Sequence, residues 1–157
     1  MTALLVELKT RARLRLNAVR SQQPDLRLRD CLNQVAKEIG FAHWDQARRV
    51  LGGEAQPGDD MGRYWHAPAC NSLLNAWFAN YSDACSALAT TQGTVLIPYQ
   101  RQFILARGPY IRELGLDHRD AAWAAAGHDL VRAYGTDPWL RLALRRLKAP
   151  QSTFAGC

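Results

Sequence analysis

Apolar residues recur at helical spacing in three segments of the first third of the chain. The segments are residues 3–20, 28–39 and 43–51, and in each the apolar side chains fall on one face at about 100° per residue. Pro24 lies between the first two segments, where it prevents one continuous helix. Gly40 suits the left-handed end of the second. The predicted buried faces are Leu4, Leu5, Leu8, Ala12, Leu16 and Val19; Cys31, Leu32, Val35, Ala36 and Ile39; and Trp44, Ala47, Val50 and Leu51.

The remainder mixes helical and extended patterns. Residues 71–89 carry a helical stripe and predict the strongest helix of the chain. Residues 94–98 and 102–106 are short, apolar and β-branched, and predict a β-hairpin over 94–106. Further helices are predicted over 119–133 and from Pro138, with Asp137 as the cap of the last one. The fold class expected is therefore mainly α (α+β), with one short hairpin.

The stretch "GGEAQPGDDMG" is rich in glycine, proline and acids, as linkers are. Residues 54–62 are accordingly expected to join a three-helix module, residues 1–53, to an α+β portion, residues 63–150. Residues 151–157 are expected to be frayed.

Charge is unevenly spread along this chain of net charge +6. Residues 1–53 hold ten Lys or Arg against five Asp or Glu, residues 54–137 hold six against nine, and residues 138–157 hold four against none. The basic ends either dock on the acidic middle or form a surface for an acidic partner such as nucleic acid.

Two features predict a cytoplasmic protein. No apolar run approaches the ~20 residues of a membrane span, and no signal peptide is expected because Glu7 and Lys9 interrupt the first apolar residues. The cysteines are widely spaced, with no CxxC pair, which favours free thiols in a reducing compartment. Cys70 and Cys85 are expected to lie on one helix, where fifteen residues at ~1.5 Å rise place them about 22 Å apart, too far for a disulfide. The four cysteines are Cys31, Cys70, Cys85 and Cys157.

The segment "VAKEIGFAHWDQARRVL" raises the possibility of a DNA-reading helix-turn-helix. Ala36 and Gly40 fit that template, but Gln46 and Arg49 stand where it needs apolar residues. The predicted buried positions, Ala47 and Val50, come one residue later, which rotates the third helix by 100°. Its outer face then carries Arg48 and Arg49, which suit phosphates but predict no base reading.

Residues 4–51 also resemble the small helical module called the glyoxalase-related protein domain. The resemblance is carried by Leu8, Lys9, Leu32, Val35, Ala36, Lys37, Gly40, Phe41 and Trp44. It implies a bacterial, cytosolic helical module of no established activity, often attached to other domains. It implies no metal site here, because residues 63–150 lack the repeated βαβββ units that a glyoxalase metal site requires.

No motif predicts catalysis, a metal or a cofactor. The histidines, His43, His66, His118 and His128, form no HxH, HxxxH or HExxH spacing, and no GxSxG, Walker or GxGxxG loop is present. His43 reads as a helix-start residue. A cluster of His118, His128, Asp129 and Glu113 would be needed for acid–base chemistry, and helix-surface positions explain these residues more simply.

The segment "IPYQRQFILARGPYIRELG" gathers aromatic and basic side chains around the hairpin. This composition suits a protein interface or a single-stranded nucleic acid, although a purely structural hairpin explains it as well. The candidate binding residues are Tyr99, Arg101, Gln102, Arg107 and Tyr110.

The sequence is compatible with three functions. The first is a non-enzymatic interaction module that binds a protein partner. The second is a nucleic-acid-binding protein, and the third is a small enzyme whose site the sequence does not locate. The nucleic-acid surface would comprise Arg11, Arg13, Arg15, Arg20, Arg48 and Arg49, with Arg145 and Arg146 as additions.

Overall fold

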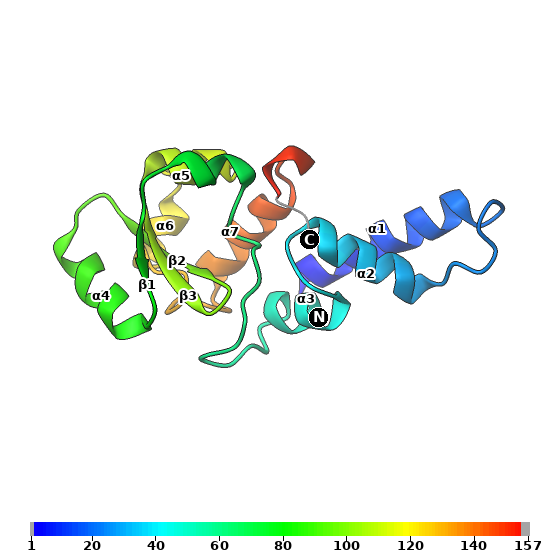
Figure 1. The fold of residues 1–157 in the computed structure, drawn as a ribbon, viewed down its shortest axis with the longest axis horizontal. Coiled ribbons are helices and arrows are strands. Elements are labelled where there is room, and N and C mark those ends of the chain that lie inside the picture. The colour runs from blue at the N-terminus through cyan, green and yellow to red at the C-terminus, as the bar shows by residue number, and fades with distance from the viewer. Residues whose placement is uncertain (1, 155–157) are drawn as a thin grey trace.

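The computed structural model describes residues 2–154 and shows an elongated molecule (Figure 1). Helices α1 (Ala3–Val19) and α2 (Leu28–Glu38) form a hairpin at one end, beside the shorter α3 (Trp44–Leu51). A small sheet with its own helices forms the other end, and α7 (Asp137–Leu147) lies between the two. The mainly α (α+β) class is confirmed.

The three N-terminal helices follow their predicted bounds closely. The side chain of Thr2 caps α1 by accepting from the Leu5 amide, and Nδ1 of His43 caps α3 by accepting from the Gln46 amide at 3.2 Å. Ala47 and Val50 are buried, as predicted. These helices form where expected because their caps and apolar stripes are local in sequence.

The sheet has three antiparallel strands in the order β1-β3-β2. Strands β2 (Val95–Tyr99) and β3 (Gln102–Ala106) form the predicted hairpin, with Tyr99 opposite Gln102. Gln100 turns the chain at φ 52°. One sheet face packs on α4 (Tyr81–Thr90) and the other belongs to the main core.

The predicted helix over residues 71–89 is wrong in its first half. Residues Pro68–Ser72 form a 3-10 turn, Ala76–Phe78 form strand β1, and only α4 is helical. The Asn80 side chain accepts from the Asp83 amide at 2.9 Å, which starts α4 at Tyr81. Residues before that cap pair with β3 instead, a long-range partner that helical periodicity does not reveal.

The predicted helix over residues 119–133 is also wrong. Helix α6 covers only Ala121–Ala125, after which Gly127 and His128 take φ 68° and 56°. The chain then runs along β2, where the Leu96 amide donates to the His128 carbonyl at 2.8 Å and the Leu130 amide donates to the Leu96 carbonyl at 3.0 Å. Pairing with this sheet edge outweighs continuation of the alanine-rich helix.

Two details at the C-terminal end differ from expectation. Thr136, rather than Asp137, occupies the cap position of α7. The frayed tail is wrong for residues 151–154, since Gln151–Thr153 form a 3-10 turn, Gln151 Nε2 donates to the Glu38 carbonyl at 2.9 Å, and Phe154 is buried. The rest of the predicted tail, residues 155–157, lies outside the described residues.

One hydrophobic core runs through both portions of the chain. It includes Leu8 and Leu51 from the N-terminal helices together with Ile104 and Trp139 from the rest. Residues 54–62 are tied down at both ends, because the Ala55 amide donates to Tyr134 Oη and the Met61 amide to the Gln100 carbonyl. The short helix α5 (Gly108–Glu113) completes the fold.

Arg146 is fully buried on α7 and faces no carboxylate. Its five N–H groups donate five hydrogen bonds, four to backbone carbonyls and one to a hydroxyl. Nε donates to the Tyr64 carbonyl at 2.8 Å. Nη1 donates to the Leu114 carbonyl at 2.8 Å and to Thr153 Oγ1 at 2.6 Å. Nη2 donates to the His66 carbonyl at 3.3 Å and to the Thr153 carbonyl at 2.8 Å. One side chain therefore joins four separate stretches of chain.

A ring completes this cage. The guanidinium carbon of Arg146 lies 3.7 Å from the ring centroid of Phe154, a cation–π distance. Burial lowers the pKa of Arg146 to about 10, which leaves the guanidinium charged at neutral pH. The residue that the sequence offered to a phosphate is thus a structural cation.

We expect Arg146→Lys to lower the free energy of unfolding by about 3 kcal/mol or more, because an ammonium offers three donors in place of five and leaves carbonyls unpaired. Chemical denaturation measures this loss. Arg141→Lys on the same helix is the matched control, since Arg141 is largely exposed, and it should change stability by less than about 0.5 kcal/mol. Equal effects of the two substitutions would contradict the structural role.

Gly40 permits a close approach between the α2–α3 turn and the following chain. Its φ is 99°, and a Cβ there would lie 2.7 Å from the carbonyl carbon of Arg63. We expect Gly40→Ala to cost about 2 kcal/mol or more, combining left-handed strain with a backbone clash. Gly53→Ala, at φ 80° with open space around it, should show only the strain, about 1 kcal/mol. Thermal denaturation of both variants tests the difference.

Candidate functional site

The five predicted hairpin residues do not form one surface. Tyr99 and Gln102 lie opposite each other at the hairpin turn, half-buried and exposed respectively. Arg101 Nη1 donates to the Gly58 carbonyl at 2.7 Å, and Arg107, at the far end of β3, donates to Gln92 O at 3.2 Å. The structure therefore brings together only Tyr99, Gln102 and Arg101.

Tyr110 does not belong to any surface. It is 1% exposed, and its hydroxyl donates to the Trp65 carbonyl at 2.7 Å. This corrects its placement among the binding residues. Its ring packs in the main core, and its hydroxyl binds the segment that carries Trp65.

Three aromatic side chains form a continuous row, called here the aromatic ledge. The rings of Trp77 and Tyr99 are 5.2 Å apart at 89°, and those of Tyr99 and His66 are 5.0 Å apart at 65°. Trp77 is 47% exposed, Tyr99 is half-buried and His66 is buried. Burial lowers the pKa of His66, which favours a neutral imidazole at the base of the ledge. Trp77 was missed in the sequence because a helix would have buried it.

Strand β1 leaves its outer edge open beside this ledge. No hydrogen bond outside the sheet ladder involves the backbone of residues 74–79 within the described chain. Leu74 is 101% exposed and Ala76 is exposed. Edge strands are normally protected by charges, by proline or by shortness; β1 has only three residues, but residues 64–82 contain no Lys, Arg, Asp or Glu. That uncharged run is the sequence signal that points to this edge.

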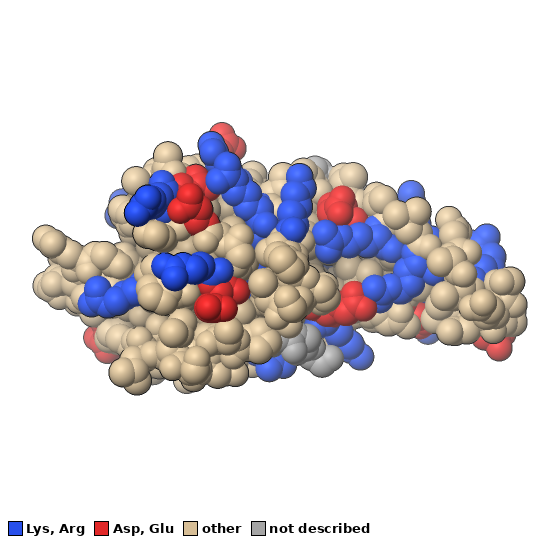
Figure 2. Space-filling model, turned by 90° about the horizontal axis from the view of Figure 1, so that it is seen from above, with Lys and Arg blue, Asp and Glu red and all other residues tan. Residues whose placement is uncertain are grey.

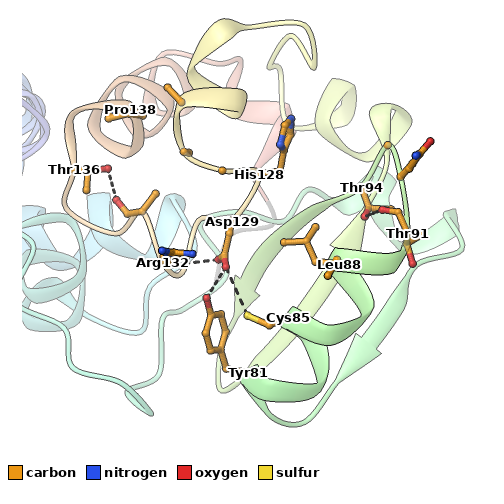
Figure 3. A pocket seen from close by; sticks show the side chains of 17 residues that line it. Tyr81, Cys85, Leu88, Thr91, Thr94, His128, Asp129, Arg132, Thr136 and Pro138 are labelled. Atoms are coloured by element: carbon orange, nitrogen blue, oxygen red, sulfur yellow. Dashed lines mark hydrogen bonds between the residues drawn. The ribbon is translucent and has the colours of Figure 1, made fainter.

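A pocket of about 850 Å³ lies between α4 and the turn after α6 (Figure 3). Asp129 is buried in its wall, with Oδ2 2.5 Å from Tyr81 Oη and 3.9 Å from Cys85 Sγ. Its Oδ1 accepts from the Val131 and Arg132 amides at 2.9 and 3.0 Å. Four donors use the carboxylate's four lone-pair sites, so Asp129 anchors the turn and has no free site for a substrate proton.

The imagined acid–base cluster does not assemble in this pocket. His128 is among the residues that line it, but His118 and Glu113 are not. Among residues 2–154, no group of three His, Cys, Asp or Glu side chains is placed to hold a metal ion. Cys31, Cys70 and Cys85 are free thiols, and Cys157 lies outside the described residues.

Most of the predicted nucleic-acid arginines are already paired with carboxylates. Arg11 meets Glu7, Arg15 meets Glu38, Arg48 meets Asp45 and Glu54, and Arg49 meets Asp59, all within 2.7–3.0 Å. Arg13 and Arg20 are exposed, Arg145 meets Asp120, and Arg146 is buried. Figure 2 shows basic and acidic side chains interleaved on one face. The basic residues therefore do not form an unpaired stripe.

No family model, no curated protein and no solved structure matches this chain. The resemblance of residues 4–51 to the glyoxalase-related protein domain thus stays a prediction. None of the helices in the described part of the chain is long and apolar enough to cross a membrane.

Buried tyrosines make stability depend on alkaline pH. Burial raises the pKa values of Tyr64, Tyr81 and Tyr110 above the usual value of about 10. The folded state favours the protonated phenols, so their contribution is complete below pH 10 and falls as pH rises above it. Burial also raises the pKa of Tyr134, so the lowered pKa of Arg146 acts in the opposite direction as one group against four tyrosines.

We expect the free energy of unfolding to fall between about pH 10 and 11, because ionisation of the tyrosines favours the unfolded chain. Denaturant titrations at pH 8, 10 and 11 measure this, with absorbance at 295 nm reporting tyrosinate. Tyr81→Phe should flatten the decline. Full tyrosinate absorbance in a protein that remains folded and equally stable would contradict the burial argument.

Proposed function

We propose that the protein is a non-enzymatic binding module that takes an extended segment of a partner protein along β1. The observation that carries this proposal is the open, uncharged edge strand with Trp77 exposed on it and Leu74 exposed just before it. A large apolar side chain on an open edge favours aggregation unless something covers it, so its presence points to a partner.

Strand addition uses both parts of the site. The free backbone edge of β1 supplies hydrogen bonds that do not depend on the partner's sequence. The aromatic ledge supplies selectivity, since exposed Trp and Tyr rings dominate binding energy at protein interfaces. Trp77 and Tyr99 hold each other in place at 5.2 Å, which reduces the entropy lost when a partner docks.

Charge indicates what the partner segment looks like. The net charge of +6 repels a second copy, whereas residues 64–82 around β1 carry no Lys, Arg, Asp or Glu, so an apolar, β-prone segment of another protein fits this edge. The nucleic-acid alternative has less support, because four of its six arginines are engaged in ion pairs.

Selection from a displayed library of random twelve-residue peptides tests the proposal. We expect enriched peptides with an apolar, β-prone centre, and we expect Trp77→Lys to weaken their binding about tenfold or more in fluorescence anisotropy. Amide exchange at residues 74–79 should slow when the peptide is bound, because strand addition protects the edge. Val6→Lys on α1 is the matched control, since Val6 is 52% exposed, and it should bind normally.

Other outcomes would overturn the proposal. Failure to enrich any peptide, or equal binding by the Trp77→Lys and Val6→Lys variants, would remove the edge from consideration. Tight binding of labelled DNA or RNA at physiological salt, lost on substitution of Arg13 and Arg20 but not of Trp77, would favour the nucleic-acid function instead.

A further inference from the structure

A second cavity, called here the hairpin pocket, lies under the opposite face of the hairpin and has a volume of about 640 Å³. Its walls come from four places: the hairpin turn, residues 55–61, the first turns of α4, and residues 131–134. The volume falls in the range of pockets that hold small molecules, about 300–1,000 Å³. Neither the edge of β1 nor the aromatic ledge contributes to it.

The walls of the hairpin pocket are mainly apolar. Phe103 and Pro98 come from the sheet, Met61 from the segment that crosses the hairpin, and Val131 from the turn after α6. Phe103 and Val131 are only half-buried, so their exposed surface is available to a ligand. An apolar ligand body would gain by displacing water from these side chains.

Two guanidinium groups give the pocket a definite polarity. Arg101 and Arg132 both line it and both are exposed. Arg101 uses one N–H on the Gly58 carbonyl and keeps others available. The Arg132 side chain makes no hydrogen bond or ion pair with the described residues, although its backbone amide binds Asp129.

Among the described residues, no free carboxylate lines the pocket to pair with these cations. The one acidic residue in its wall is Asp59, whose Oδ2 already accepts from Arg49 Nη2 at 2.9 Å and from the Gln56 amide at 2.8 Å. An apolar cavity with unsatisfied arginines and a neutralised acid selects against cations and in favour of anions.

We propose that the hairpin pocket binds a small amphipathic carboxylate, with its apolar body against Phe103 and Val131 and its carboxylate on Arg132 and Arg101. This ligand site goes beyond the proposed function and does not depend on it. Guanidinium groups bind carboxylates through paired N–H donors, which fixes the orientation of the ligand and supplies the selectivity that the apolar walls lack.

Calorimetric titration with decanoate and with indole-3-acetate tests the proposal, with decanol as the uncharged counterpart. We expect at least one carboxylate to bind, and decanol to bind about tenfold or more weakly than decanoate. Arg132→Gln should weaken carboxylate binding about tenfold, whereas Arg112→Gln, an exposed arginine on α5, should leave it unchanged. Val131→Phe, which places a ring where the apolar body of the ligand would lie, should abolish binding while the protein stays folded by circular dichroism.

Reaction of Cys85 with a maleimide gives an independent readout of position. Cys85 lines the hairpin pocket and is partly exposed, while Cys31 and Cys70 are buried, so in a Cys157→Ser variant bound carboxylate should slow modification of Cys85. Cys85 also lines the pocket of about 850 Å³, whereas Arg101 lines only the hairpin pocket of the two, so Arg101→Gln should remove the protection. Absence of binding by both carboxylates at millimolar concentration, equal affinity for decanol and decanoate, or binding that survives Val131→Phe would overturn the proposal. None of these results bears on peptide binding at β1, so the two proposals fail separately.

Discussion

The buried guanidinium of Arg146 is the constraint on which the rest of the structure depends. From the last turn of α7, it binds carbonyls of the segment after the linker, of the end of α5 and of the C-terminal turn. A buried charge is costly unless every donor is satisfied, so these stretches are held in the positions that satisfy it. Those positions bring the helical end and the sheet end of the molecule onto one core.

One edge of the sheet is covered and the other is open, and the open edge forms the candidate binding surface. The chain after α6 runs along β2 and covers that edge through the Leu96 backbone. No described element covers β1, which pairs with β3 on one side only. Asp129 supports the covered edge, since its carboxylate fixes the turn that follows the bridge.

The hairpin separates two environments with different uses. On the main-core face, Tyr99 extends the core outward through Trp77 and leaves rings at the surface. On the other face, Phe103 and Pro98 lie over the hairpin pocket, which residues 55–61 close from the side. The segment that reads as a linker therefore acts as a wall, because both of its ends are hydrogen-bonded to distant parts of the chain.

The sequence by itself determined the three N-terminal helices and the hairpin, because their caps, apolar stripes and turns involve residues close together in the chain. Only the tertiary structure decided that Ala76–Phe78 pair as a strand, that α6 stops at Ala125, and that Arg146 is buried. Each of those outcomes depends on a partner elsewhere in the chain. Strand β1 pairs with β3, and the turn after α6 pairs with β2. Arg146 binds the carbonyls of Tyr64, Leu114 and Thr153. The candidate surface follows the same rule, since the uncharged run of residues 64–82 was visible in the sequence, but its exposure required the sheet.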